Sequence, residues 1–121
     1  YAEQVTIDKS LALIGPNADK AGDDPARSAE AIVEFPAGAS NGSTLLGVGD
    51  DLDWVEISGL DLRCQDTTLP NYHYLVTTSK VDDLVVRNNR MYGSEIPLFV
   101  LTANDQTVYR TGMLVEGNYI D

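Results

Sequence analysis

Apolar residues fall into short runs along the whole chain, with polar turns between them. The runs are rich in valine, isoleucine and leucine, and none keeps a helical period for long. Glycine, proline, asparagine and aspartate gather in the intervening segments, as is typical of turns. The pattern predicts β-strands at residues 5–7, 11–14, 31–35, 44–48, 54–57, 60–64, 73–78, 84–86, 97–102 and 113–115.

Three of these segments superimpose on one another at a fixed spacing. The matching stretches start at positions 57, 86 and 115, so the offset between successive copies is 29 in both cases. Each copy has glycine or asparagine at its third position and an apolar residue at its sixth. Both residue types tolerate a positive φ, so sharp bends between strands are expected at Gly59, Asn88 and Gly117.

A fixed spacing of this kind predicts columns of equivalent side chains in a stack of coils. The inward columns consist of Ile57, Val86 and Val115, and of Leu62, Met91 and Ile120. Asn89 and Asn118 are expected to form a ladder of hydrogen-bonded amides, an arrangement that stabilises stacked parallel strands.

The repeat is less regular in the N-terminal third of the chain. Ile7, Ile32 and Ile57 are equally spaced, so Ile7 and Ile32 are expected to extend the first inward column. The polar segment 19–29, with Asp24-Pro25 at the start of a turn, is expected to leave the coil as a protruding loop or a single helical turn.

Together these features predict an all-β fold, a right-handed parallel β-helix (a solenoid) of roughly four to five coils. Residues 1–121 form a single domain, since a chain of this length can bury one continuous core. Both ends of the solenoid are expected to be uncapped, which would expose unpaired strand edges and favour stacking end to end.

The repeat also resembles a known superfamily. Residues 1–17 (YAEQVTIDKSLALIGPN) resemble the opening coil of pectin-lyase-like β-helix proteins, which include pectin methylesterases and many bacterial surface proteins. Residues 27–33, 55–62 and 84–92 are similar to further coil segments of that superfamily. The resemblance implies an interior piece of such a β-helix, located outside the cell or at its surface. It is more specific for the fold than for an activity, because the motifs encode coil geometry.

Charge and cysteine content narrow the classes of function. The chain has 8 basic and 19 acidic residues, a formal net charge of -11, which disfavours nucleic acid and anionic membrane surfaces as partners. No apolar run is long enough to span a membrane. Cys64 is the only cysteine, which excludes an intrachain disulfide, and its alternation with Leu60 and Leu62 predicts a small buried thiol.

An arginine and two glutamates are the candidates for catalysis. The repeat places Ser58, Arg87 and Glu116 in one outward column, with Glu56 close to it. Glu116 held ionised beside Arg87, with Glu56 as its partner, would suit acid–base chemistry. A surface ladder of ion pairs is the more common alternative, and the two aspartates that the esterase relatives need on this sheet have no match here.

Acidic turns are the candidates for a metal. Asp50, Asp51 and Asp53 share one turn, and Asp82 follows Asp53 by one repeat, so the two turns are expected to be adjacent. Clustered carboxylates suit calcium, the one cofactor that the sequence suggests, although solvated turns are the commoner outcome.

The aromatic candidates for ligand binding are Tyr72 and Tyr74, which flank His73 and are expected to share a face. Exposed aromatic rings stack on sugars, whereas inward rings would only fill the core. His73 is the only histidine, and neither a catalytic triad nor a metal site forms around it in the sequence.

The favoured function is therefore a non-catalytic extracellular β-helical module. It would bind a polysaccharide or cell-surface glycan, or serve as a structural or adhesive unit, with self-association through its ends. The alternative is a fragment of a polysaccharide lyase or carbohydrate esterase of pectin-lyase-like fold.

Overall fold

The computed structural model describes residues 1–64, 73–78, 80–100 and 112–121, and in these residues the regular structure is entirely β. In these residues twelve strands form three sheets, in which neighbouring strands are parallel. The first sheet contains β1 (Val5–Ile7), β4 (Thr44–Val48), β7 (Tyr74–Thr78) and β10 (Ile96–Val100). The second sheet contains β2 (Leu11–Ile14), β5 (Leu52–Ser58), β8 (Val81–Arg87) and β11 (Gly112–Glu116). The third sheet contains β3 (Ile32–Glu34), β6 (Asp61–Arg63), β9 (Arg90–Tyr92) and β12 (Tyr119–Ile120).

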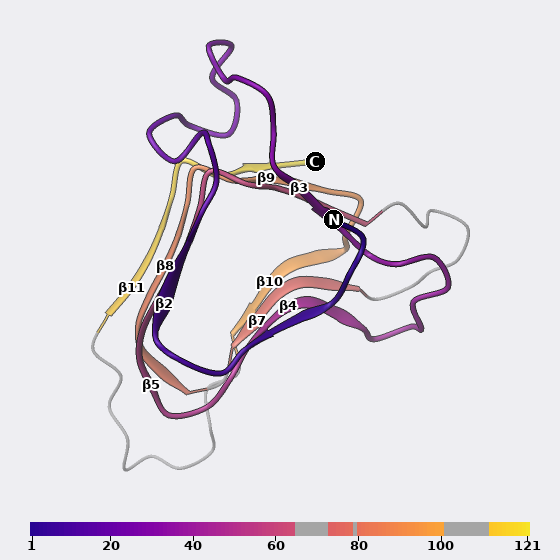
Figure 1. Cartoon of the computed structure of the whole chain (residues 1–121), viewed down its shortest axis with the longest axis vertical. Helices are drawn as coiled ribbons and strands as arrows, with labels where there is room; N and C mark the ends of the chain where they lie inside the picture. The colour runs from indigo at the N-terminus through magenta and orange to yellow at the C-terminus, as the bar shows by residue number, and fades with distance from the viewer. Residues whose placement is uncertain (65–72, 79, 101–111) are drawn as a thin grey trace.

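The chain passes through the three sheets in the same order four times. Figure 1 looks along the stack and shows the strands of each sheet superimposed along one side of a triangle. Each pass forms one layer and contributes one strand to every sheet. The arrangement is consistent with the predicted parallel β-helix, and its four layers fall within the predicted range.

The register of the strands confirms both inward columns of the repeat. The aligned residues are Ile57, Val86 and Val115 in the second sheet, and Leu62, Met91 and Ile120 in the third. The spacing of the sequence repeat therefore corresponds to one complete pass around the triangle.

The predicted extension of the first column to Ile7 and Ile32 is wrong. Ile7 lies in the first sheet and Ile32 in the third, whereas Leu13 occupies the position opposite Ile57. The first layer carries a long connection between β2 and β3 that adds residues without adding to a strand. Equal spacing in the sequence therefore does not give equal positions in the stack.

Inward side chains from all three sheets form one hydrophobic core. Ile57, Leu62 and Val86 have no exposed surface, and Cys64 is 5% exposed, which confirms the predicted buried thiol. Burial of apolar surface is the main stabilising contribution in a fold of this kind. Among the described residues, no helix could cross a membrane.

Sharp bends join the second sheet to the third where the repeat has glycine or asparagine. The φ angle is 69° at Gly59, 56° at Asn88 and 59° at Gly117. Backbone pairing continues through these bends, since the N–H of Gly59 donates to the carbonyl of Arg87 and the N–H of Asn88 to that of Glu116. The three bends therefore stack along one corner, and residues 59, 88 and 117 are called the bend column.

A side-chain amide follows each of the last two bends. Nδ2 of Asn89, which is fully buried, donates to the carbonyl of Ile57 at 2.9 Å and to Oδ1 of Asn118 at 3.1 Å. Oδ1 of Asn89 accepts a bond from the N–H of Leu60 at 3.0 Å. Nδ2 of Asn118 donates to the carbonyl of Val86 at 2.8 Å. Each amide thus ties its own layer to the preceding one, and the two amides form the expected ladder.

Residues 15–31, between β2 and β3, form a strap that contacts the outside of the bend column. Figure 1 shows this segment extending from one corner of the triangle. The N–H of Gly15 donates to the second layer, and the carbonyl of Ala18 accepts from Nδ2 of Asn88 in the third layer. The N–H of Gly22 donates to the fourth layer. The strap therefore joins the first layer to each of the other three.

An ion pair of low exposure closes the strap. The side chains of Arg27 and Glu30 are 3% and 13% exposed. Nε and Nη2 of Arg27 donate to the two carboxylate oxygens of Glu30 at 2.8 and 2.9 Å, and Nη1 donates to the carbonyl of Asn88 at 2.8 Å. Buried Asn17 also donates to Glu30, at 2.9 Å. Arg27 therefore anchors the strap on the bend column.

The strands β10, β11 and β12 each pair on one side only within the described part of the chain. Their exposed large apolar side chains are Val100, Met113, Leu114, Val115, Tyr119 and Ile120. At the opposite end of the stack, the main chain of residues 1–3 bonds to β3. Self-association through strand edges remains a prediction.

Gly59→Ala tests the bend column. A Cβ at Gly59 would overlap the backbone nitrogen of Ala18 in the strap, and φ is positive there, so we expect the free energy of unfolding to fall by about 3 kcal/mol. Gly42→Ala is the matched control, because Gly42 also has a positive φ but no atom within 4 Å of an added Cβ. We expect urea denaturation to show that Gly42→Ala lowers the free energy of unfolding by about 1 kcal/mol. Equal losses for both variants would contradict the close packing of the strap on the bend.

Acid should weaken the attachment of the strap. The hydrogen-bonded Arg27 guanidinium holds the pKa of the Glu30 carboxyl below its ordinary value of 4.5. As the pH falls, Glu30 is therefore protonated in the unfolded chain before it is protonated in the folded chain. The contribution of Glu30 to the free energy of unfolding is complete above pH 4.5 and is lost as the pH falls through the lowered pKa. Unfolding free energies of the wild type and Glu30→Gln, measured from about pH 7 to about pH 3, should therefore converge in acid. A difference that does not change with pH would exclude this contribution.

Candidate functional site

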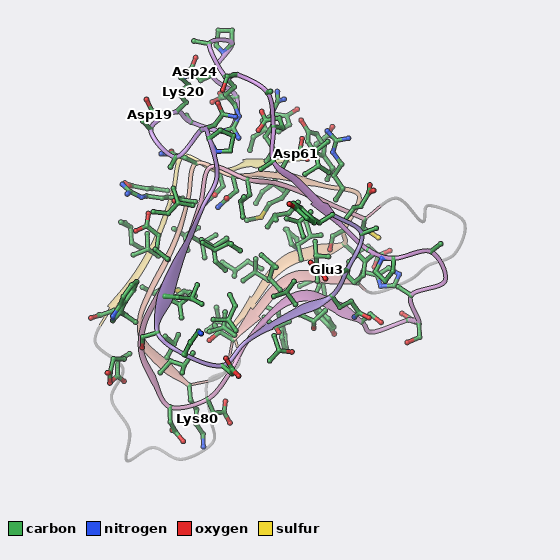
Figure 2. All side chains as sticks on the ribbon, viewed as in Figure 1. Glu3, Asp19, Lys20, Asp24, Asp61 and Lys80 are labelled. Carbon is green, nitrogen blue, oxygen red and sulfur yellow. The ribbon has the colours of Figure 1, made fainter. Side chains whose placement is uncertain are left out.

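The outward face of the third sheet brings together charged and aromatic side chains from successive layers. Leu62 and Met91 face the core, so their neighbours in each strand face outward. Two outward columns result, one of Ile32, Asp61, Arg90 and Tyr119, and one of Glu34, Arg63 and Tyr92. Figure 2 places Asp61 on this side of the triangle, close to the strap. This surface is called the third-sheet face.

Two tyrosine rings form the aromatic part of the third-sheet face. The ring centroids of Tyr92 and Tyr119 are 5.9 Å apart, with an interplanar angle of 57°. The guanidinium carbons of Arg63 and Arg90 lie 5.9 and 6.0 Å from the centroid of the Tyr92 ring. Tyr119 is 38% exposed and so offers its ring to solvent. The face therefore combines the Tyr92 ring, which two arginines contact, with the Tyr119 ring, which is accessible to solvent.

Carboxylates hold both arginines of this face in place. Nε and Nη2 of Arg63 each donate to a carboxylate oxygen of Asp61 at 2.7 Å, and this pairing raises the pKa of the Arg63 guanidinium above its ordinary value. Nε of Arg90 donates to the carbonyl of Gly22 in the strap at 2.9 Å, and its Nη1 lies 3.7 Å from Glu30. Since donors and acceptors are fixed before any ligand arrives, the face is preorganised.

Two hollows lie where β6 and β9 end, and Cys64 lines both of them. One, of about 430 Å³, is lined by Arg63, Cys64, Tyr92 and Gly93. The other, of about 440 Å³, is lined by Ala2, Glu34, Phe35, Pro36, Ala37, Gly38, Ala39, Cys64 and His73. The Phe35 and His73 rings lie 4.8 Å apart, and buried Nδ1 of His73 has no hydrogen-bond partner among the described residues. The first hollow is open and adjoins the tyrosine ring, so it extends the third-sheet face.

The predicted catalytic group assembles as an ion pair on the second sheet. Ser58, Arg87 and Glu116 share one column, as the repeat indicates, but Nε and Nη2 of Arg87 both donate to Oε1 of Glu56 at 3.0 Å. The Ser58 hydroxyl and the Arg87 guanidinium hold the pKa of the Glu56 carboxyl below its ordinary value. Within the described residues the Ser58 oxygen has no hydrogen-bond partner, so the two hydrogen bonds from Arg87 are the cause that the geometry supports. Glu56 is therefore a carboxylate at neutral pH.

The acidic turns do not assemble a metal site in the part of the chain that the structure describes. Leu52 lies opposite Val81 and Trp54 opposite Asp83, so Asp53 does lie beside Asp82, as the repeat predicts. The other predicted ligands, Asp50 and Asp51, immediately precede β5. No group of three His, Cys, Asp or Glu side chains among the described residues could hold a metal ion.

Of the predicted tyrosine pair, the structure describes only Tyr74, which lies on another sheet than the third-sheet face. Tyr72 lies outside the described residues, and Tyr74 belongs to the first sheet, where its ring lies 5.1 Å from that of Phe99. Tyr92 and Tyr119 were not among the predicted ligand-binding residues, although the repeat contains the necessary signal. Residues 61, 90 and 119, and residues 63 and 92, are each one repeat apart, so they had to align if the coil was correct.

No protein-family model, curated protein or solved structure matches the chain. Its function is therefore inferred from the chemistry of the third-sheet face.

The Glu56–Arg87 pair can be tested directly by NMR titration of the Glu56 carboxyl carbon. We expect a titration midpoint below 4.5 in the wild type and a higher midpoint in Arg87→Met, because the cation that stabilises the ionised form is removed. Arg63→Met, which removes a guanidinium from another sheet, should leave the midpoint unchanged. An unchanged midpoint in Arg87→Met would show that the pair does not set the ionisation of Glu56.

Proposed function

We propose that the chain is a non-catalytic glycan-binding module built on a right-handed parallel β-helix of the pectin-lyase-like kind. The observation that carries the proposal is the third-sheet face, where Tyr92 and Tyr119 lie among guanidinium–carboxylate pairs. The right hand is part of the proposal because parallel strand connections strongly prefer it. The superfamily and the extracellular location are supported by the sequence resemblance alone.

A sugar presents an apolar face of C–H groups and a rim of hydroxyls. An exposed tyrosine ring can pack against the first, and the accessible ring of Tyr119 is placed for this contact. Hydroxyls accept hydrogen bonds, and the partly exposed Arg63 guanidinium, which Asp61 holds in place, offers N–H donors to them. The face thus provides both kinds of interaction within one rigid sheet.

The strap and the sheet hold the face in position. The backbone of Gly22 packs so closely on Tyr119 that a Cβ there would overlap the Tyr119 nitrogen and the Asn89 carbonyl. Arg90 is bonded to that same strap glycine. Little side-chain entropy then has to be lost on binding, which favours recognition of a weakly interacting ligand such as a sugar.

Binding without catalysis is proposed ahead of the lyase or esterase alternative. Glu56, the best-placed carboxyl of the predicted catalytic group, is paired with Arg87 and has a lowered pKa, so it is a weak proton acceptor and has no proton to donate near neutral pH. Unsaturated product from polygalacturonate and calcium, detected by ultraviolet absorbance, would instead favour the lyase.

Tyr119→Ala tests the proposal after a glycan array has identified a bound oligosaccharide. We expect the affinity to fall about tenfold, which corresponds to about 1.4 kcal/mol, because the exposed ring is lost. Tyr74→Ala is the matched control, since it removes a tyrosine ring from the first sheet. Calorimetry should show wild-type affinity for this control. Binding to no glycan on the array, or equal loss in both variants, would contradict the proposed site.

A further inference from the structure

We infer that the third-sheet face selects neutral glycans and excludes polyuronates and other acidic sugar polymers. This inference rests on the proposed glycan binding and adds the class of ligand. Its basis is the pairing of each arginine on or next to the face with a carboxylate of the protein itself. An acidic sugar would have to compete with those carboxylates for the same cations.

The Asp61–Arg63 pair is difficult to separate. Asp61 has no exposed surface and accepts two short hydrogen bonds from Arg63, which is itself 36% exposed at its side chain. If a ligand carboxylate drew Arg63 away, Asp61 would remain as a buried charge without its partner, which is strongly unfavourable. Arg63 is also aligned with Glu34 of the neighbouring strand, so a second carboxylate already acts on it.

The two remaining arginines near the face share Glu30. Arg27 uses two of its nitrogens for the Glu30 carboxylate and is only 3% exposed, so a ligand cannot reach it. Arg90 donates to the backbone of Gly22 and lies 3.7 Å from Glu30. Three guanidinium groups are thus balanced by the carboxylates of Glu30, Glu34 and Asp61, and the face has no net positive charge to offer.

The lysines and Arg87 do not supply the missing cation, because Arg87 lies on the second sheet and is paired with Glu56. The described lysines lie outside the third sheet: Lys9 between β1 and β2, Lys20 in the strap, and Lys80 between β7 and β8. Figure 2 shows Lys80 at the opposite corner from Asp61. The formal net charge of -11 adds a long-range repulsion against any polyanion.

A neutral sugar avoids this competition. Asp61 occupies two of the five N–H donors that a guanidinium carries, so Arg63, whose side chain is 36% exposed, keeps donors for a ligand. The oxygen of a sugar hydroxyl can therefore accept a hydrogen bond from Arg63 while the ion pair stays intact.

The experiment compares matched hexasaccharides, neutral cello-, xylo- and manno-hexaose against hexagalacturonate, by calorimetry in the presence of a chelator that removes bridging cations. We expect wild type to bind at least one neutral hexasaccharide and to bind hexagalacturonate at least tenfold more weakly. Asp61→Asn frees Arg63 while preserving the shape of the side chain, so hexagalacturonate affinity should rise at least tenfold and decrease with added salt. Asp53→Asn makes the same change in net charge on the second sheet and should leave the preference unchanged.

Wild-type preference for hexagalacturonate would overturn the inference and leave the proposed glycan binding intact. An Asp61→Asn variant that is folded by circular dichroism but gains no affinity for hexagalacturonate would also overturn it. Glu34→Gln then provides a second removal of charge beside Arg63, with the same expected gain. Binding of no hexasaccharide by the wild type would reject the inference together with the proposed function.

Discussion

The close contact between the strap and the bend column is the constraint on which the rest of the fold depends. At Gly59 the backbone needs a positive φ to turn from the second sheet into the third, and the strap passes directly over the place where a side chain would be. Glycine satisfies both requirements. One layer later Asn88 also adopts a positive φ, and its amide donates to the strap carbonyl of Ala18. The turn and the packing around it therefore select the residue together.

This corner also determines the chemistry of the third-sheet face. Because all three bends turn at equivalent positions, the strands after them start in register, and side chains one repeat apart align. Tyr119 and Arg90 then meet the strap at Gly22, whereas Arg63 meets Asp61 within its own strand. The alignment of the proposed binding surface therefore depends on the bend column, although Tyr92 and Tyr119 do not belong to that column.

The sequence was most informative where one residue type has one physical reason to be present. Gly59, Asn88 and Gly117 identified the bends, and the aliphatic columns beside them gave the register of two sheets. The first layer was less predictable, because the strap interrupts the spacing and Leu13, not Ile7 or Ile32, continues the column. Strap contacts such as Arg27 with Asn88 join residues that no local pattern relates.

The candidate site was predictable only in part for a similar reason. The repeat aligned Ser58, Arg87 and Glu116 correctly. Arg87 nevertheless bonds diagonally to Glu56, because its side-chain conformation, which the strand register does not determine, directs it there. The columns containing Tyr92 and Tyr119 followed from the same spacing. Their significance emerged only when the third sheet showed which ring is supported by arginines and which one is open to solvent.

The strap also changes how such a stack is expected to unfold. In a simple solenoid each layer interacts only with its neighbours, so the ends can unravel while the middle remains intact. Here a single segment from the first layer is bonded to the second, third and fourth, and the contact between Gly22 and Gly117 joins positions far apart in the chain. Loss of the last layer would release part of the strap, and loss of the strap would weaken every layer. The molecule should therefore behave as one cooperative unit, with the slow folding that long-range contacts impose.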